Sequence, residues 1–318
     1  SFLASKRFFI IMLRIHKITF DFIMINCYYV IVLRPEGAGI YLFNYIQEEI
    51  IMKKLVALVL VAVMGLSMVG CGKKDSSNDS KSDLEYVKEK GTLVVGVTDF
   101  APMDYKDDSG NWIGFDADMA SAFAESIGVK AEFVEIDWDN KIMELDGKTI
   151  DCVWNGMTLT EGVMKAMETS NPYSKNEQVV VVKAEKKDEY NSLDAIKELN
   201  FAAEAGSAGE EVLNDLGYKV TPVASQADAV KEVAAGTSDV AVIDLLMAGA
   251  VIGEGTSYEN LTYTISLSET PENFGVGFRK GSDLAEKLNE FFVKSYADGS
   301  MIEIAEKYGV QEAIIEQK

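Results

Sequence analysis

The sequence GKTIDCVWNGMTLT, residues 147–160, passes from a glycine that can end a helix into a short apolar run and then into a polar loop. Apolar runs of this length between turn signals are typical of buried strands. The sequence GTSDVAVID, residues 236–244, repeats the order of glycine, aspartate, apolar run and polar end. The repeat predicts two similar strands, one in each of two lobes.

Strand and helix patterns alternate along the chain around these two stretches. Apolar runs predict further strands at residues 93–97, 131–136, 179–182, 201–203, 218–223 and 274–278. Helical periodicity and stop signals predict helices at residues 115–127, 142–145, 193–199, 210–216, 227–235, 284–297 and 301–308. Such alternation predicts an α/β fold with parallel sheets covered by helices on both faces. Because ligands bind beyond the carboxyl ends of strands in open α/β sheets, residues 155–160 and Asp244 mark two candidate binding edges.

Charge and missing side chains exclude several classes of function. The formal net charge is −21, and residues 72–318 contain 23 Lys and Arg against 47 Asp and Glu, so we expect no nucleic acid binding. The only histidine is His16, and the cysteines Cys27, Cys71 and Cys152 show no C-x-x-C spacing. A mature chain beginning at Cys71 therefore lacks the histidine of Ser-His-Asp and Cys-His enzymes and of the usual zinc sites. We expect no enzyme activity, no metal and no cofactor.

Residues 52–71 have the order of a bacterial lipoprotein signal peptide. Lys53 and Lys54 precede an apolar run of 15 residues, which is shorter than the roughly 18–20 residues of a transmembrane helix. The run ends in MVGC, residues 68–71, which resembles a lipoprotein cleavage site with Cys71 as the lipidated residue, although leucine usually stands where Met68 does. An uncleaved signal anchor is the alternative.

The residues on either side of this signal have separate interpretations. Residues 72–83, GKKDSSNDSKSD, contain no apolar side chain and predict a disordered tether. Residues 47–51, QEEII, can be encoded by a ribosome-binding sequence just before Met52. We therefore expect residues 1–51 to be an upstream extension outside the translated protein, with a second membrane segment as the alternative.

Several motifs occur in the order and spacing of one known family. They lie at residues 91–105, 114–116, 137–160, 171–173 and 206–211. In these motifs the chain resembles the polar amino acid binding proteins of ABC importers, the bacterial extracellular solute-binding proteins of family 3, and the resemblance covers residues 84–318. It implies a type 2 periplasmic-binding-protein fold, whose two lobes are joined by two crossing strands and close over a ligand. Lobe 1 would comprise residues 84–182 plus 272–318 and lobe 2 residues 183–271, with crossings near residues 180–183 and 271–275.

The resemblance implies five ligand-binding residues in lobe 1. Phe100 stands where the family stacks an aromatic ring on the ligand, and Trp138 faces it from the other side. Asn155, Gly156 and Thr158 match the strand-end loop that bonds the ligand through backbone and hydroxyl groups. On the residues alone, Phe100 and Trp138 could equally be core aromatics; facing the cleft, they would suit a cationic group.

Two residues of lobe 2 complete the implied site. Ser207 matches the loop that receives the ligand carboxylate, and Asp244 matches the acid that holds the α-amino group. Ser207 and Glu210 also form an S-x-x-E capping box, so that Ser207 caps a helix, binds an anion at the helix start, or does both. Asp244 either caps the following helix or pairs with a cation.

The chain departs from the family at one position of the implied site. The family pattern runs Met-Thr-Ile-Thr-Pro-Glu-Arg, and its arginine clamps the α-carboxylate. Here the pattern is MTLTEGV, residues 157–163, so Val163 replaces the arginine. Because hydrogen bonds to charged groups contribute ~1.5–3 kcal/mol each, either Ser207 and backbone N–H groups bind the carboxylate or the ligand lacks a standard α-carboxylate.

We therefore expect a substrate-binding lipoprotein of an ABC importer, held by its lipid on the outer face of the bacterial cell membrane. It would capture an amino acid or a related amine-bearing small solute in an interlobe cleft and deliver it to an ABC permease. One alternative is an enzyme on the same fold, a cyclohexadienyl-type dehydratase, which would need a positioned acid or base. The other is the ligand-binding domain of a sensory system.

Overall fold

The computed structural model describes residues 10–13, 29–34, 37–40, 81–268 and 270–318. The chain forms two compact units, Ser1–Asn78 and Asp79–Lys318. In the first unit, β1 (Ile10–Leu13), β2 (Tyr29–Arg34) and β3 (Gly37–Ile40) pair as an antiparallel sheet. The predicted signal peptide, Cys71 and most of the predicted tether lie outside the described residues. Within the described ranges no helix combines the length and the apolar character needed to span a bilayer.

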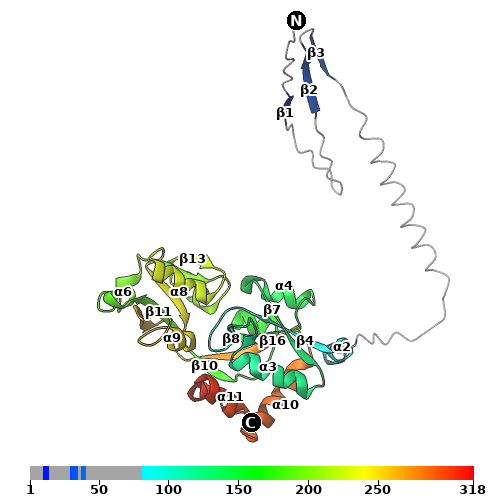
Figure 1. Cartoon of the computed structure of the whole chain (residues 1–318), viewed down its shortest axis with the longest axis vertical. Coiled ribbons are helices and arrows are strands. Elements are labelled where there is room, and N and C mark those ends of the chain that lie inside the picture. Colours follow the sequence, from blue (N-terminus) through cyan, green and yellow to red (C-terminus); the bar gives the residue numbers. More distant parts are fainter. Residues whose placement is uncertain (1–9, 14–28, 35–36, 41–80, 269) are drawn as a thin grey trace, which may run out of the picture. The chain divides into compact units, whose positions relative to one another are not determined.

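The described part of the second unit contains two large sheets and a two-stranded hairpin, and we call each large sheet with its helices a lobe (Figure 1). The sheet of lobe 1 has the order β10-β16-β8-β4-β7, with β9 paired to β16. Its strands are β4 (Thr92–Val97), β7 (Lys130–Glu135), β8 (Cys152–Thr158), β9 (Glu168–Thr169), β10 (Ser174–Asn176) and β16 (Glu272–Phe278). Its helices are α2 (Asp83–Lys90), α3 (Phe115–Ser126), α4 (Lys141–Asp146), α5 (Glu161–Ala166), α10 (Leu284–Ala297) and α11 (Ser300–Tyr308). The hairpin β5 (Tyr105–Lys106) and β6 (Trp112–Ile113) and the 3₁₀ turns η2 (Trp138–Asn140) and η4 (Gln311–Ala313) complete it.

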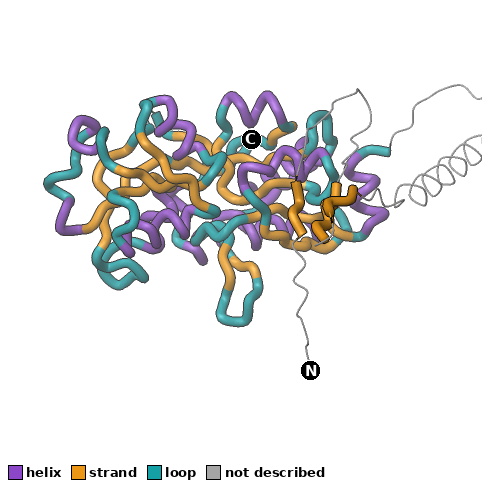
Figure 2. Tube along the Cα trace, turned by 90° about the horizontal axis from the view of Figure 1, so that it is seen from above, coloured by secondary structure: helices purple, strands orange, loops and turns teal. Residues whose placement is uncertain are grey.

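The sheet of lobe 2 has the order β13-β12-β14-β11-β15. Its strands are β11 (Gln178–Lys183), β12 (Asn200–Glu204), β13 (Lys219–Val223), β14 (Val240–Asp244) and β15 (Leu261–Ser266). Its helices are α6 (Leu193–Ile196), α7 (Ala208–Asp215), α8 (Gln226–Ala235) and α9 (Leu245–Val251), with the 3₁₀ turn η3 (Ala184–Lys186). In both lobes the strands run through the interior and the helices flank them (Figure 2).

The predicted parallel pairing holds for three strands of each sheet. β4 is parallel to β7 and β8, and β12 is parallel to β13 and β14. The other strands, β10, β16, β11 and β15, pair antiparallel. Two of them, β11 and β16, are the strands by which the chain enters a sheet from the other lobe. No βαβ crossover precedes these strands, so nothing forces them into the parallel direction.

The chain passes between the lobes at two short segments. The first lies between β10, which ends at Asn176 in the sheet of lobe 1, and β11, which begins at Gln178 in the sheet of lobe 2. We expected this crossing near residues 180–183, but those residues lie inside the sheet of lobe 2. Lobe 2 therefore begins near Gln178 rather than at Lys183. The return passage lies between the ends of β15 at Ser266 and β16 at Glu272.

Two aspartates fix the starts of the strands in the repeated stretches. The Asp151 Oδ2 atom accepts from the Val94 backbone N at 2.8 Å, and the Asp151 N donates to the Val94 O at 2.7 Å. In lobe 2, the Asp239 Oδ2 atom accepts from the Asn200 N at 2.9 Å, and the Asp239 N donates to the Asn200 O at 3.0 Å. The repeat seen in the sequence therefore corresponds to the same pair of hydrogen bonds in each lobe, which join the residue before a strand to the backbone of the parallel neighbouring strand.

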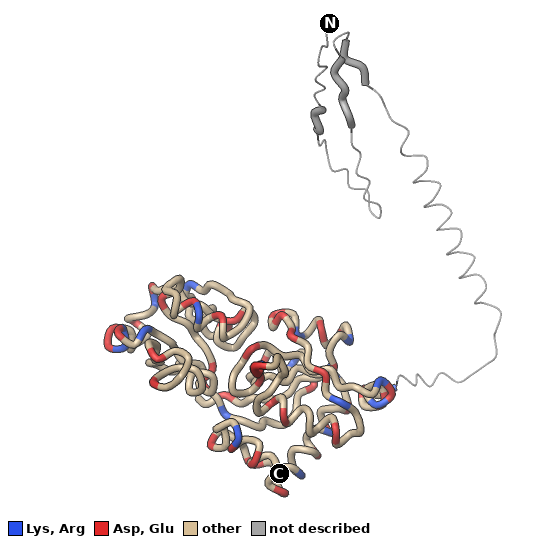
Figure 3. Tube along the Cα trace, in the orientation of Figure 1, with Lys and Arg blue, Asp and Glu red and all other residues tan. Residues whose placement is uncertain are grey.

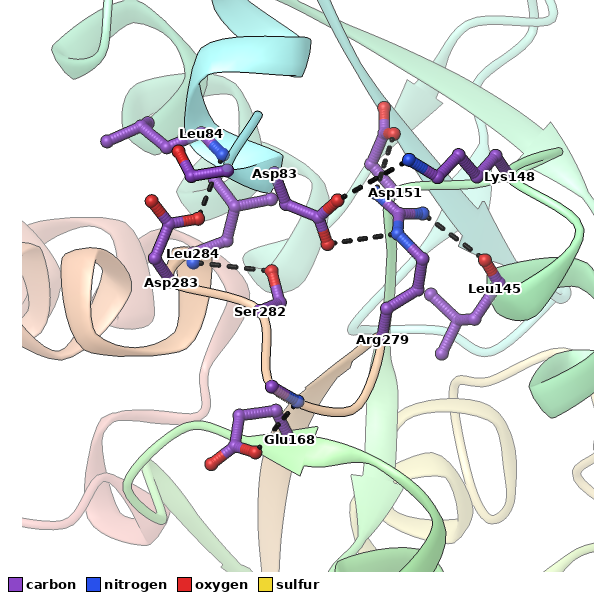
Figure 4. A network of polar contacts seen from close by, with 12 residues as sticks. Asp83, Leu84, Leu145, Lys148, Asp151, Glu168, Arg279, Ser282, Asp283 and Leu284 are labelled. Atoms are coloured by element: carbon purple, nitrogen blue, oxygen red, sulfur yellow. Dashed lines mark hydrogen bonds and ion pairs between the residues drawn. The ribbon is translucent and has the colours of Figure 1, made fainter. Parts of the chain in front are cut away.

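In lobe 1, Arg279 adds further contacts to Asp151 and to the residues around it (Figure 4). Its Nη2 atom lies 3.4 Å from Asp151, its Nη1 atom donates to the Ile150 O at 2.8 Å, and its Nε atom donates to Asp83 in α2 at 2.9 Å. The Asp151 side chain is fully buried, and Lys90 of α2 is its second cation. One guanidinium thus joins α2, the start of β8 and the end of β16.

Substituting Arg279→Ala is expected to lower the free energy of unfolding by about 3 kcal/mol, because buried Asp151 loses one of its two cations and the Ile150 O loses its donor. Urea denaturation followed by circular dichroism measures the change. The control is Lys280→Ala, whose side chain is 57% exposed and which we expect to cost at most about 1 kcal/mol. Equal midpoints for the two variants would contradict the role given to Arg279.

A pair of buried carboxyl groups lies beneath the loop that follows β4. The Asp116 Oδ2 atom accepts from the Gly156 N and the Tyr173 hydroxyl, each at 2.6 Å, and Asp104 accepts from Asn155 at 2.8 Å. Burial raises the pKa of Asp116 to about 7. Burial and the neighbouring Asp116 raise the pKa of Asp104 well above its ordinary value.

Both pKa values are raised by folding, so the folded chain holds protons that the unfolded chain has released. The free energy of unfolding should therefore fall as pH rises from about 4 to about 7. Asp104→Asn removes one of the two acids and should flatten this decline, whereas Asp108→Asn, at an exposed position, should leave it unchanged. Urea titrations at several pH values test this, and an equally steep decline in Asp104→Asn would refute it.

Candidate functional site

The strand ends of the two lobes bring polar residues together in the second unit. The central strands β12 and β14 end at Glu204 and Asp244, side by side in one sheet. On the lobe 1 side, Thr98 follows β4 and lies next to Asn155 of the neighbouring β8. The Lys141 Nζ atom of lobe 1 donates to the Gly206 O, two residues after Glu204, at 2.9 Å. These strand ends form what we call the interlobe junction.

Asn155 positions Thr98 with its whole side chain. The Asn155 Oδ1 atom accepts from the Thr98 N at 3.0 Å and from the Thr98 hydroxyl at 2.8 Å. The Asn155 Nδ2 atom donates to the Thr98 O at 3.0 Å and to Asp104 at 2.8 Å. All four hydrogen-bonding positions of the amide are thus occupied. A direct bond from this side chain to a ligand would have to displace one of them.

Phe100 and Gly156 pack against each other inside lobe 1. Phe100 is 1% exposed, and its ring meets Phe274 edge-on with centroids 6.1 Å apart. Gly156 has φ +52°, and a Cβ atom there would lie 2.2 Å from the Phe100 ring. Only glycine therefore fits at position 156. Thr158, at the end of β8, donates to Glu272 at 3.2 Å.

Trp138 and Lys141 lie where lobe 1 meets lobe 2. The Lys141 Nζ atom lies 4.9 Å from the centroid of the Trp138 ring and donates to the Trp138 O at 3.1 Å. It also donates to the Gly206 O of lobe 2 at 2.9 Å, so one ammonium bridges the lobes. Burial lowers the pKa of Lys141. Val163 packs onto the apolar cluster that contains Trp138, so no charge stands at the position of the family's arginine.

Ser207 forms the helix cap that the sequence predicted. Its Oγ atom accepts from the Glu210 N at 3.1 Å, and the Glu210 carboxylate accepts from the Gly206 N at 2.7 Å. The Ser207 N donates to the Glu204 O at 3.1 Å. The cap therefore fixes the turn that leads from β12 into α7, while an anion-binding role for Ser207 stays a prediction.

Asp244 does not cap the helix that follows it. It precedes α9 without a side-chain capping bond, and it is 4% exposed. Its Oδ1 atom accepts from Gln178 at 2.7 Å and from Asn176, and its Oδ2 atom accepts from Gln226. Burial raises the pKa of Asp244 to about 7. Three amide groups thus hold the carboxylate, and one of its roughly four lone-pair positions remains for a further donor.

Sequence reasoning missed Glu204, Lys141 and the amide groups around Asp244. Glu204 follows the apolar run 201–203 as Asp244 follows 240–243, and this parallel was the signal for it. The amides of Asn176, Gln178 and Gln226 gave no local signal, because they come from the interlobe passage and from α8.

Two other surface features lie apart from the junction. Acidic positions are spread over both lobes, in keeping with the negative net charge (Figure 3). A surface hollow of about 400 Å³ is lined by Lys183, Ala184, Glu185 and Asn260. Because Gln178 pairs with Asp244 at the other end of β11, this hollow lies at the opposite edge of the sheet from the candidate site.

Comparisons with known proteins agree on one family. The model of the bacterial extracellular solute-binding proteins, family 3, matches residues 93–311. The arginine-binding extracellular protein ArtP of Bacillus subtilis is 26% identical over 262 residues, which cover 81% of this chain and 98% of that protein. The L-cystine-binding protein TcyJ of Escherichia coli is 28% identical over 253 residues, covering 78% of this chain and 94% of that protein. A crystal structure of a mutant arginine-binding protein from T. maritima is 30% identical, with a TM-score of 0.66, over 71% of this chain and 98% of that one.

These relatives are binding proteins and not enzymes, and their fold is the two-lobed α/β fold described above. The family match spans both lobes, from within β4 to η4. The chain therefore belongs to the bacterial extracellular solute-binding proteins, family 3.

Proposed function

We propose that this chain captures an amino acid or a related amine-bearing solute between its two lobes and delivers it to an ABC permease. The observation that carries the proposal is Asp244, a buried carboxylate at the interlobe junction. In the described part of the chain it takes part in no ion pair and no helix cap. A protonated amine of a ligand would use its remaining lone-pair position.

The energetics of burial support this role for Asp244. A buried charge is costly unless it is paired and hydrogen-bonded, and the amides of Asn176, Gln178 and Gln226 supply only the hydrogen bonds. Nearby Glu272 is also acidic and raises the pKa of Asp244. An ammonium group at this position would therefore gain a charge-assisted hydrogen bond and relieve the repulsion between two acids.

For the ligand carboxylate we propose the Lys141 ammonium together with the start of α7. Lys141 has three N–H donors, of which the Trp138 O and the Gly206 O accept two. Gly206 immediately precedes Ser207, so the third donor lies close to the cap of α7. A helix start and a lysine together favour an anion, which offsets the loss of the arginine at Val163.

We also propose that Cys71 carries a lipid and holds the folded unit on the outer face of the cell membrane. The proposal rests on the signal-like residues 52–71 and on the polar residues 72–83 that follow them. Mass spectrometry of the protein from bacterial membranes would detect a lipidated N-terminal Cys71. Recovery of an unmodified Cys71 would exclude the anchor without touching the binding proposal.

Asp244→Asn is expected to abolish binding of every amine-bearing ligand that the parent chain binds, because the amide keeps the shape but carries no charge. The ligand is identified by screening a panel of amino acids and amines for a rise in the melting temperature of the parent chain. A ligand at 100 times its dissociation constant should raise the parent's free energy of unfolding by ~2.7 kcal/mol. Asp188→Asn, at an exposed position of lobe 2, is the matched control. Unchanged binding by Asp244→Asn would refute the ammonium site.

Val163→Arg should strengthen binding of ordinary α-amino acids about tenfold or more, because it restores a bidentate donor for the carboxylate worth ~1.5–3 kcal/mol per bond. Val163→Met has similar length and no charge, so it should leave these affinities within a factor of ~2. Isothermal titration calorimetry compares the two variants. Equal affinities would show that position 163 does not reach the ligand carboxylate.

A further inference from the structure

Glu204 is a buried acid to which the proposed function assigns no role. It is the last residue of β12 and is 3% exposed. Its Oε1 atom is fully buried and has no hydrogen-bond partner. No ion pair in residues 81–268 and 270–318 includes it. Unpartnered buried carboxylate oxygens are rare in folded proteins and call for an explanation.

The Glu204 carboxylate lies at the interlobe junction and not in the core of lobe 2. Glu204 ends β12 beside the end of β14, and the Gly206 O two residues later accepts from Lys141 of lobe 1 at 2.9 Å. Burial raises the pKa of Glu204 to about 8, and the charges of Asp244 and Lys141 also act on it. The charge of Lys141 acts on Glu204, but its ammonium donates to the Trp138 O and the Gly206 O and forms no ion pair with Glu204. The position that would neutralise Glu204 is therefore left for a group from outside the chain.

We propose that Glu204 is a specificity-determining residue that binds a second cationic nitrogen, so that the preferred solute is an amino acid with a basic side chain. This inference rests on the proposed function, in which Asp244 holds the first cationic nitrogen. Glu204 and Asp244 end adjacent parallel strands, which places two carboxylates along one edge for the two ends of one ligand.

The charges at the junction are complementary to this class of solute. Of the charged groups that act on Glu204, Asp244 and Asp228 are acidic and Lys141 is the one base, and Glu272 is a further acid near Asp244, so acids outnumber bases at the junction. Glu272 is only half-buried and accepts from Thr158, Gln178 and Ser268, so it is already hydrogen-bonded. A dibasic amino acid carries two cationic groups and one carboxylate, so one cationic group can pair with Asp244 and the other with Glu204. A neutral amino acid would leave Glu204 without a partner.

Calorimetry on the full chain tests the inference with matched pairs of ligands. L-arginine is compared with L-citrulline, and L-lysine with L-2-aminoheptanoic acid, because each pair shares its shape and differs in the side-chain charge. The parent chain should bind a basic member ~100-fold more tightly than its neutral partner, and Glu204→Gln should reduce this ratio to within ~3-fold. Asp215→Asn, an exposed acid at the end of α7, is the control and should keep the parent's ratio.

The outcomes separate this inference from the proposed function. Parent binding of neutral amino acids as tightly as basic ones, or an unchanged ratio in Glu204→Gln, would overturn the role of Glu204 and leave Asp244 intact. Tight binding of agmatine, which lacks the carboxylate, at the level of arginine would replace the amino acid by a diamine and overturn the proposed class. Failure of every amine to bind the parent would contradict the proposed function itself. The melting temperature of ligand-free Glu204→Gln should equal or exceed that of the parent, which shows that the variant folds.

Discussion

The hydrogen bonds that Asp151 and Asp239 make at the starts of β8 and β14 set the register on which both lobes depend. Each aspartate holds the backbone of the parallel neighbour through its side chain and its own N–H group. A slip of one residue would turn every side chain of a strand to the opposite face of the sheet. With the starts fixed, strands of fixed length end at fixed places, so that Asn155 meets Thr98 and Glu204 ends beside Asp244. The positions of the candidate binding residues at the carboxyl ends of the strands thus depend on hydrogen bonds at the amino ends of the same sheets.

This geometry places two acids where the lobes meet, and the two differ in their hydrogen bonds. Asp244 is held by three amide side chains, whereas one oxygen of Glu204 has no partner. An unmade hydrogen bond of a buried group costs ~1–3 kcal/mol, and such departures from local consistency are expected at functional sites. In a binding protein the ligand can supply the missing contact. The contact that a ligand makes with this oxygen would then contribute to its affinity.

Local patterns in the sequence predicted those parts of the molecule that local forces determine. The helix predicted at residues 115–127 is α3, Phe115–Ser126, and the helix at 284–297 is α10. The cap at Ser207 needed only neighbouring residues, so it was also predictable. The boundary at β11 was not, because a β-branched run does not reveal which of two sheets receives it. The amides around Asp244 and the bridge from Lys141 to Gly206 join residues far apart in sequence, and no local pattern encodes such contacts.

The replacement of an arginine by Val163 and the presence of Glu204 both make the charge of the junction more negative. In the family pattern, an arginine and an aspartate match the two charges of a zwitterionic amino acid. Here Val163 joins the apolar cluster of Trp138, and Lys141 is the cation that the junction retains. With Glu204 added to Asp244, the junction has two buried acids for cationic groups, whereas a zwitterion has one cationic group. Closing two lobes over uncompensated charge is unfavourable, since the surrounding protein solvates an ion far less well than water does. A solute with one net positive charge removes this penalty, and the acidic surface of both lobes attracts such a solute from a distance.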